Sequence, residues 1–227
     1  MRKIVAIANV AGGTGKSTTA HALAVACVEY GKKVLVLDLD VSTSLTFQLG
    51  LENERTTLSD FVLGATINES QITTVVERFD FIPSDSRIST LVETEKFSIF
   101  FDSLPKEYDL VLMDTPSTID PRLVMALEIS DLILIPVASN LHSIRGANQV
   151  NKIAQNKSVI GFKIEIGSSG DYWDESFSYL DATIPNSELV GESLSHISSV
   201  VTQSNRSEVA GAYRELAYSL LEKLELI

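Results

Sequence analysis

Residues 9–18 have the sequence NVAGGTGKST, and this stretch decides the fold of the chain. An apolar run over residues 4–8 precedes it, and a helix-like segment over residues 19–30 follows it. A strand, a glycine-rich loop and a helix in this order direct backbone N–H groups and the positive end of the helix dipole at one anion. The stretch therefore predicts a loop that binds phosphate.

The residues of this loop predict a nucleotide with magnesium rather than an empty turn. Glycines adopt backbone angles that other residues avoid, so their N–H groups can turn inward around phosphate. Lys16 is placed to reach the β- and γ-phosphates, and the hydroxyl of Ser17 is placed to ligate Mg²⁺. The strict pattern G-x-x-x-x-G-K-[ST] fails at its first position, where the chain has Val10. The expected nucleotide-binding residues are Gly12, Gly13, Thr14, Gly15, Lys16, Ser17 and Thr18.

The length and composition of the chain predict one α/β domain over residues 1–227. Hydrophobic residues make up 44% of the chain and charged residues 21%, which is ordinary for a protein with a well-buried core. No apolar run approaches the roughly 18–20 residues that span a membrane, and we expect no signal peptide before the first strand. Cys27 is the only cysteine, so an intrachain disulfide is impossible and a cytoplasmic location is expected.

The net charge of −12 argues against a protein that is basic overall. Nucleic-acid-binding proteins usually present a positive patch, because neutralisation of phosphates dominates their affinity. Here 18 Lys and Arg residues are interleaved with 30 Asp and Glu residues, and no basic tract occurs. A basic patch assembled in a dimer stays open as an alternative.

Apolar runs alternate with amphipathic segments, as repeated βαβ units require. Continuous apolar runs such as residues 33–38 are typical of strands buried on both faces. Asp120 and Pro121 suit the start of a helix, as its N-cap and its first residue. We expect an α/β fold with a doubly wound, mostly parallel sheet and helices on both faces. The expected strands cover residues 33–38, 79–83, 109–114, 131–136 and 158–166, and the expected helices cover residues 19–30, 57–63, 88–104, 121–129, 143–155, 174–180 and 207–226.

Carboxylates stand where two of the expected strands end, namely Asp38 with Asp40, and Asp114. In an open parallel sheet, ligands bind beyond the carboxyl ends of the strands, where the glycine-rich loop also lies. Carboxylates there can ligate Mg²⁺ directly or through water, and can orient a water for attack on the γ-phosphate. The alternative is that each Asp only caps the turn that follows. Alternation places Asp38 and Asp40 on one face, so either can act while the other supports it.

Three nucleotide motifs occur in order, at residues 9–18, 38–46 and 108–116. Two further strings, at residues 134–137 and 212–217, accompany them. Together they resemble the deviant-Walker ATPases of the ParA/MinD superfamily, and the resemblance extends along the whole chain. It implies a P-loop NTPase fold of the SIMIBI type, a cytoplasmic or nucleoid-associated ATPase, and the cofactors ATP and Mg²⁺.

The resemblance also implies a role for each acid and for the lysine of the loop. Lys16 would bind phosphate and take part in catalysis, and Ser17 would ligate Mg²⁺. Asp114 would be the Walker B-type acid near the metal. Asp40 would position the hydrolytic water, with Asp38 in support. Members of the superfamily form an ATP-bound homodimer with the nucleotide at its interface.

In ParA-type members this dimer binds nonspecific DNA, and an adaptor such as ParB stimulates hydrolysis and releases the dimer from DNA. The cycle moves plasmids, chromosome origins or protein cargoes over the nucleoid. The resemblance thus predicts a cargo-positioning ATPase that works as a homodimer with an adaptor protein and without a membrane.

The chain departs from the family pattern at Ala11, where the signature lysine belongs, and at residues 41–42, where Pro-Gln is common. Alanine cannot supply a cation to the charge that develops on phosphate. A similar loss occurs in the carboxysome-positioning McdA proteins, whose adaptor is McdB, and a lysine from the C-terminal half is thought to take over there. Lys152 is the first candidate here, followed by Arg145 and Lys157. The alternative is that these are solvated surface cations.

Other functions with a related loop give different expectations. A MinD-like membrane-cycling ATPase needs a basic amphipathic helix at its end, whereas Arg and Lys over residues 214–227 are balanced by Glu. A nucleotide-switched scaffold with little turnover is favoured by Ala11 and disfavoured by Asp40 and Asp114. An iron–sulfur ATPase is excluded, because Cys27 alone cannot hold a cluster between subunits. A small-molecule ligase with a related loop stays open.

Aromatic residues gather at Tyr172, Trp173 and Tyr179, in a serine-rich segment. They leave three alternatives open: a partner-binding surface, a contact to the nucleotide base, or packing over the edge of the sheet. The sequence assigns no site to them.

Overall fold

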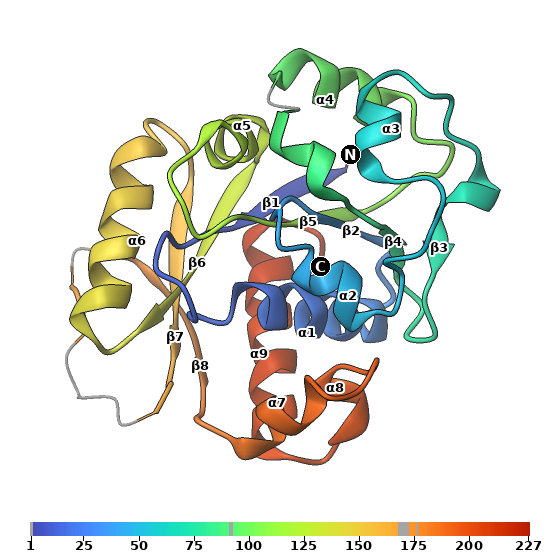
Figure 1. Cartoon of the computed structure of the whole chain (residues 1–227). Coiled ribbons are helices and arrows are strands. Elements are labelled where there is room, and N and C mark those ends of the chain that lie inside the picture. The colour runs from blue at the N-terminus through green and yellow to red at the C-terminus, as the bar shows by residue number, and fades with distance from the viewer. Residues whose placement is uncertain (1, 91–92, 168–172, 176) are drawn as a thin grey trace.

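A mostly parallel sheet of eight strands forms the centre of the protein (Figure 1). The computed structural model describes residues 2–90, 93–167, 173–175 and 177–227. The strands are ordered β3-β4-β2-β5-β1-β6-β7-β8, and all neighbours are parallel except β3 with β4. They are β1 (Lys3–Ile7), β2 (Val34–Asp38), β3 (Thr73–Thr74), β4 (Asp80–Ile82), β5 (Leu110–Asp114), β6 (Leu132–Ala138), β7 (Val159–Ile164) and β8 (Tyr179–Ile184).

Helices cover both faces of this sheet (Figure 1). Helices α1, α2, α8 and α9 share one hydrophobic cluster with the sheet, and α3, α4, α5 and α6 share the other. The helices are α1 (Lys16–Glu29), α2 (Ser44–Gln48), α3 (Leu58–Val62), α4 (Thr94–Asp102), α5 (Pro121–Ile129), α6 (Leu141–Ile153), α7 (Glu188–Ser193), α8 (Val200–Gln203) and α9 (Glu208–Lys223), with 3-10 turns at Glu69–Gln71 and Ser86–Thr90. This arrangement confirms the expected doubly wound α/β fold.

The central strands are buried on both faces because their side chains alternate between the two clusters. On β1, Val5 and Ile7 join the cluster beneath α1 and α9, whereas Ala6 joins the cluster beneath α5 and α6. This explains why the sequence of each central strand is a continuous apolar run rather than an alternating one. Cys27 lies in the first cluster, and burial raises the pKa of its thiol to about 12.

The expected helix over residues 174–180 is wrong for the residues of that span that the structure describes. The chain instead enters β8 at Tyr179 and pairs in parallel with β7. Along β8, Leu180, Ala182 and Ile184 are buried while the residues between them are exposed. A period of two at the edge of a sheet thus overrides local helical propensity.

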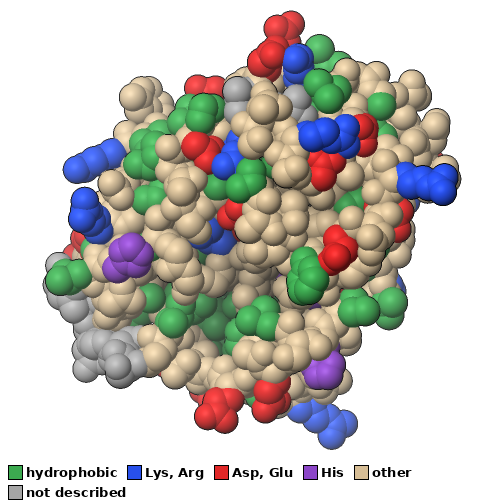
Figure 2. All heavy atoms as spheres, viewed as in Figure 1, with side chains coloured by type: hydrophobic (Ala, Val, Ile, Leu, Met, Phe, Trp, Pro, Cys, Tyr) green, Lys and Arg blue, Asp and Glu red, His purple; other side chains and the backbone are tan. Residues whose placement is uncertain are grey.

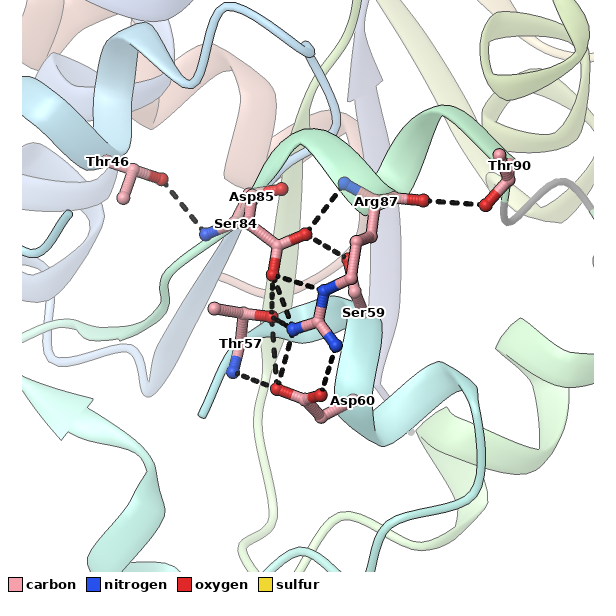
Figure 3. A network of polar contacts seen from close by, with 8 residues as sticks. All are labelled: Thr46, Thr57, Ser59, Asp60, Ser84, Asp85, Arg87 and Thr90. Atoms are coloured by element: carbon pink, nitrogen blue, oxygen red, sulfur yellow. Dashed lines mark hydrogen bonds and ion pairs between the residues drawn. The ribbon is translucent and has the colours of Figure 1, made fainter. Parts of the chain in front are cut away.

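The expected helix over residues 88–104 is divided in two. The 3-10 turn ends at Thr90, and α4 begins at Thr94 after Glu93, whose backbone is extended (φ −89°, ψ 111°). A polar network attaches the 3-10 turn to α3. In it, the guanidinium of Arg87 bonds Asp60 of α3 at 2.7 and 3.0 Å and Asp85 at 2.6 and 3.0 Å (Figure 3).

The other expected elements are present, with ends that shift by a few residues. Helix α6 starts at Leu141, because the side chain of Asn140 accepts a bond from the backbone N–H of Ser143 and caps the helix. In the described part of the chain, the helices are too short or too polar to cross a bilayer.

The parallel strands bring the expected site together at one edge of the sheet. In the strand register, Ile7 of β1 and Asp38 of β2 both stand opposite Asp114 of β5. The glycine-rich loop begins just after Ile7, the last residue of β1. The loop and the carboxylates therefore share the crevice beyond the carboxyl ends of the strands.

Candidate functional site

The glycine-rich loop forms an open cradle at the start of α1. Gly13 (φ 71°) and Gly15 (φ 80°) adopt the left-handed backbone that favours glycine, and Gly15 is the N-cap of α1. A side-chain carbon added at Gly12 or Gly13 would meet no atom within 4 Å. No side chain caps this helix start, so its first N–H groups are available to an anion.

Lys16 is buried beside this cradle. Its ammonium donates a hydrogen bond to the hydroxyl of Ser117 at 2.5 Å and to the carbonyl of Ala11 at 3.4 Å. Burial lowers the pKa of Lys16, and the carboxylates of Asp114 and Asp40 oppose that shift. The ammonium therefore lies between the loop and both acids.

Asp38 is completely buried and saturated with hydrogen bonds. Its carboxylate accepts from the backbone N–H of Asp40 and from the backbone and hydroxyl of Thr46, each at 3.1 Å. The same Thr46 hydroxyl accepts from the backbone N–H of Ser84, next to the network of Figure 3. Asp38 thus fixes the backbone around Asp40 and the start of α2, which fits a supporting residue.

Asp40 is half-buried at the mouth of the crevice. One of its carboxylate oxygens accepts a hydrogen bond from the backbone N–H of Ser42 at 2.9 Å. Its other oxygen is not engaged in any hydrogen bond or ion pair within the described residues. Among the acids of the site, Asp40 is the one that solvent reaches.

Asp114 is buried, and neither of its carboxylate oxygens forms a hydrogen bond of ordinary geometry among the described residues, although the Ser17 hydroxyl lies close enough to act on its pKa. Burial raises its pKa to about 8, and the charge of Asp38 adds to this, whereas the hydroxyl of Ser17 and the ammonium of Lys16 lower it. A buried carboxylate whose hydrogen bonds are not satisfied is unfavourable in a folded protein and signals a ligand that completes it.

A magnesium ion fits the residues around Asp114. The Ser17 hydroxyl and the Asp114 carboxylate are oxygen ligands of the kind that Mg²⁺ prefers. Within the described ranges, no group of three His, Cys, Asp or Glu residues could hold a metal by itself. This matches an ion that takes most of its ligands from water and from the phosphates of a nucleotide.

Two residues that the sequence did not single out attach the loop to α6. The buried amide of Asn9 donates to the carbonyl of Pro136 at 2.9 Å and accepts from the backbone N–H of Ala11 at 2.9 Å. Gly146 of α6 lies against them, since a side-chain carbon there would stand 2.2 Å from the Asn9 oxygen and 2.7 Å from the Ala11 nitrogen. Ala11 is consequently buried beneath α6.

The structure places the three candidate substitute cations differently. Lys152 and Lys157 line a cavity of about 520 Å³ between the ends of α5 and α6, and the ammonium of Lys157 donates to the carbonyl of Ser130 at 3.1 Å. Lys152 follows Leu141 by eleven residues, about 16 Å along the helix, so it lies away from the loop of its own chain. Arg145 is exposed and directly precedes Gly146, which lies against the loop. Of the three candidate cations, Arg145 is therefore the one whose position in the chain is nearest the loop.

A cavity of about 310 Å³ adjoins the loop (Figure 2). Its walls come from the ends of β7 and β8, from α7 and from Tyr213 of α9, and they include Ile164, Pro185, Asn186 and Leu194. No local pattern of the sequence indicates it, because these walls lie more than a hundred positions from the loop along the chain. Its size and its apolar lining with a few polar groups suit a planar ring.

The aromatic residues are packed at the edge of the sheet. The rings of Trp173 and Tyr179 meet edge to face with centroids 6.5 Å apart, and the ammonium of Lys163 lies 5.4 Å from the Trp173 ring. Neither residue lines the cavity beside the loop. This supports the packing alternative for the two residues, while Tyr172 lies outside the described residues.

Comparison with known proteins gives the same family. A family described as "AAA domain" matches residues 2–165. The septum site-determining protein MinD of Helicobacter pylori is 31% identical over 163 residues, covering 70% of this chain and 61% of that protein. The sporulation initiation inhibitor protein Soj of Bacillus subtilis is 30% identical over 162 residues, covering 66% of this chain and 64% of that protein. The match thus spans less than two thirds of each relative's own length.

A solved structure supports the fold. MinD of Pyrococcus horikoshii in complex with Mg-ADP superimposes with a TM-score of 0.82 at 24% identity, covering 97% of this chain and 96% of the other. These sequence similarities agree with the order of the motifs along the chain and with the sheet that the two structures share. The chain belongs to the ParA/MinD superfamily of P-loop ATPases.

Proposed function

We propose that this protein is a ParA-type ATPase that dimerises with Mg-ATP and positions or segregates a plasmid, chromosome or protein cargo. The observation that carries the proposal is Asp114, a buried carboxylate whose oxygens form no hydrogen bond of ordinary geometry among the described residues, beside an open phosphate cradle. A protein that only needed a stable turn would have no use for that arrangement.

The nucleotide would occupy the cradle and the adjoining cavity together. The loop N–H groups and Lys16 would bind the β- and γ-phosphates, and the hydroxyl of Ser117 would release the Lys16 ammonium as phosphate arrives. The base would enter the cavity lined by Ile164, Pro185 and Asn186. Mg²⁺ held by Ser17 and Asp114 would neutralise charge on the phosphates.

Asp40 is the residue best placed to orient the attacking water. It reaches solvent at the mouth of the crevice, and the Ser42 N–H fixes one of its oxygens while the other stays available. Asp38 holds the backbone of this segment and does not contact solvent. We assign the orientation of water to Asp40 and its support to Asp38.

A second copy of the chain would cover the face around the crevice. Hydrophobic side chains are exposed there on the segments that border the site (Figure 2), and soluble proteins seldom leave such a face uncovered. They are Val41, Phe47, Ile119, Leu141, Leu194 and Ile197. This supports a homodimer with the nucleotide near its interface.

The cation missing at Ala11 would then come from the other copy. Lys152 is our first candidate from sequence, and Arg145 is the candidate whose position in α6 is closest to the loop. Single variants Lys152→Ala and Arg145→Ala separate them through ATP-dependent dimerisation and ATPase rate. If neither variant lowers either quantity, both assignments fail.

Cargo positioning also requires an adaptor protein of the ParB or McdB kind and a track. We propose nonspecific DNA as the track, as in ParA-type relatives. The test measures ATPase rate and DNA retention with and without ATP for the wild type, Asp40→Ala and the control Asp102→Ala. Asp102 is an exposed residue at the end of α4.

We expect hydrolysis in the wild type and in Asp102→Ala and its loss in Asp40→Ala. A rate that Asp40→Ala leaves unchanged would overturn the hydrolytic assignment. ATP-dependent dimers without turnover in the wild type would instead favour the nucleotide-switched scaffold, and absence of DNA retention would remove DNA as the track.

A further inference from the structure

Arg122 is an arginine with 7% exposure in the first turn of α5. Its guanidinium bonds both carboxylate oxygens of Asp120, at 3.2 Å from Nε and 2.5 Å from Nη2. Its remaining terminal nitrogen, Nη1, donates to the carbonyl of Leu39 at 3.2 Å. One side chain thus joins α5 to the residue between Asp38 and Asp40.

Leu39 is held from both sides. Its backbone N–H donates to the carbonyl of Asp114 at 2.9 Å, and its own carbonyl accepts the bond from Arg122. The loop after Asp114 leads to Asp120 at the start of α5. Arg122 therefore closes a ring of contacts between the segment that carries Asp40 and the loop that follows Asp114.

The same loop carries the partner of the phosphate-binding lysine. Ser117, which accepts the hydrogen bond from Lys16, lies between Asp114 and Asp120. Asp120 is itself fixed, because it accepts from the backbone N–H of Arg122 at 2.9 Å and from the hydroxyl of Thr118 at 2.8 Å. The positions of Lys16, Asp40 and Asp114 thus depend on one interconnected loop.

Stability alone does not account for a buried arginine at this place. Asp120 is partly exposed while Arg122 is nearly buried, and an ion pair that takes a guanidinium out of water gains little over an apolar side chain of similar volume. A guanidinium, however, can bond a carboxylate with two nitrogens and a carbonyl with another, which fixes geometry in a way that an ammonium cannot. Arg122 therefore serves to fix the position of Leu39 relative to Asp120.

We propose that Arg122 is a positioning residue, which holds the Asp40 segment in register with the Asp114 loop so that both acids and Lys16 meet the γ-phosphate together. This inference rests on the proposed ATPase function. Arg122 itself contacts neither the cradle nor the cavity beside it, as judged from its bonds to Asp120 and Leu39 and from the residues that line the cavity.

The test compares Arg122→Met with the control Arg214→Met. Arg214 of α9 makes the same kinds of bonds far from the crevice: to both carboxylate oxygens of Glu29 at 2.6 and 3.1 Å and to the carbonyl of Asn205 at 2.8 Å. We expect Arg122→Met to lower kcat about tenfold or more, because small displacements of catalytic groups have such effects, while KM for ATP changes little. Arg214→Met should change neither.

A milder variant guards against loss of the fold. Asp120→Asn keeps a side chain that caps α5 but removes the charge that Arg122 pairs with. We expect a smaller fall in kcat than in Arg122→Met, again without a matching rise in KM. If both variants keep the kcat and KM of Arg214→Met, the proposal is wrong.

Hydrogen–deuterium exchange decides the role of Arg122 even if the wild type turns over no ATP. Arg122→Met should speed amide exchange over residues 39–44 and 115–120, and Arg214→Met should leave it unchanged. Unaltered exchange in these two segments would overturn the positioning role. An inactive wild type with the expected exchange pattern would count against the ATPase proposal alone.

Discussion

Asp38 and Asp114 are both buried, yet their surroundings differ. Burial raises the pKa of Asp38 to about 6 despite its bonds to Thr46 and Asp40. Burial raises the pKa of Asp114 to about 8, and the charge of Asp38 adds to the shift. Without a cation, Asp114 therefore retains a proton near neutral pH. A cation at this place would replace that proton.

The raised pKa of Asp114 predicts how stability depends on pH in the absence of nucleotide. At Asp114 the folded protein binds more protons than the unfolded chain between the ordinary value of 3.8 and about 8. The contribution of Asp114 to the free energy of unfolding should therefore fall as pH rises through this window. Asp114→Asn should flatten the dependence, as measured by urea unfolding at several pH values. An equal slope in the wild type and the variant would contradict the shift.

Helix α6 meets the phosphate loop more closely than any side chain at residue 146 would allow. Gly146→Ala would place a carbon 2.7 Å from the backbone nitrogen of Ala11, so the helix or the loop must move. We expect this variant to lose about 1–3 kcal/mol of stability, as overpacked cores do, and to bind ATP more weakly. Urea unfolding and titration with a fluorescent ATP analogue measure the two effects.

Gly211→Ala is the matched control for that variant. Gly211 lies within α9, and a side-chain carbon there would meet no atom within 4 Å. This change should stabilise the protein by about 0.5–1 kcal/mol, because alanine favours the helix over glycine. If Gly146→Ala behaved like Gly211→Ala, the contact between α6 and the loop would have no consequence.

The elements differ in how far their sequence predicts them. Local signals predict the glycine-rich loop, α1 and the acids at the ends of β2 and β5, because each depends on neighbours in the chain. The bonds of Asn9 to β6 and of Arg122 to Leu39 join residues 127 and 83 positions apart, so no local pattern indicates them. The edge strand β8 was missed for a related reason, since its partner β7 defines it.

The face that surrounds the crevice distinguishes one side of the whole molecule. Phe47 of α2 is 68% exposed on this face, whereas Tyr218 of α9 is 49% exposed and contacts Tyr30, which follows the end of α1 that points away from the glycine-rich loop. An uncovered hydrophobic side chain of this size is typical of an interface. Variants of Phe47 and Tyr218 therefore test whether this face forms the dimer interface.

Phe47→Asp should abolish the dimer that forms with Mg-ATP, because a buried carboxylate at the interface would lose its water without gaining a partner. Tyr218→Asp should leave the dimer intact. Light scattering after size-exclusion chromatography, with a slowly hydrolysed ATP analogue, measures the mass of each variant. Equal masses for the two variants would place the dimer interface elsewhere.

The contact between Ala11 and Gly146 couples residue 11 of the phosphate loop to the sequence of α6. Ala11 is 1% exposed beneath α6, so a lysine there has no room while the helix stays in place. Ala11→Lys would thus strain the contact between the loop and α6 unless α6 changed at the same time. The two positions are structurally coupled, so a cation that reaches the phosphates has to come from outside residue 11.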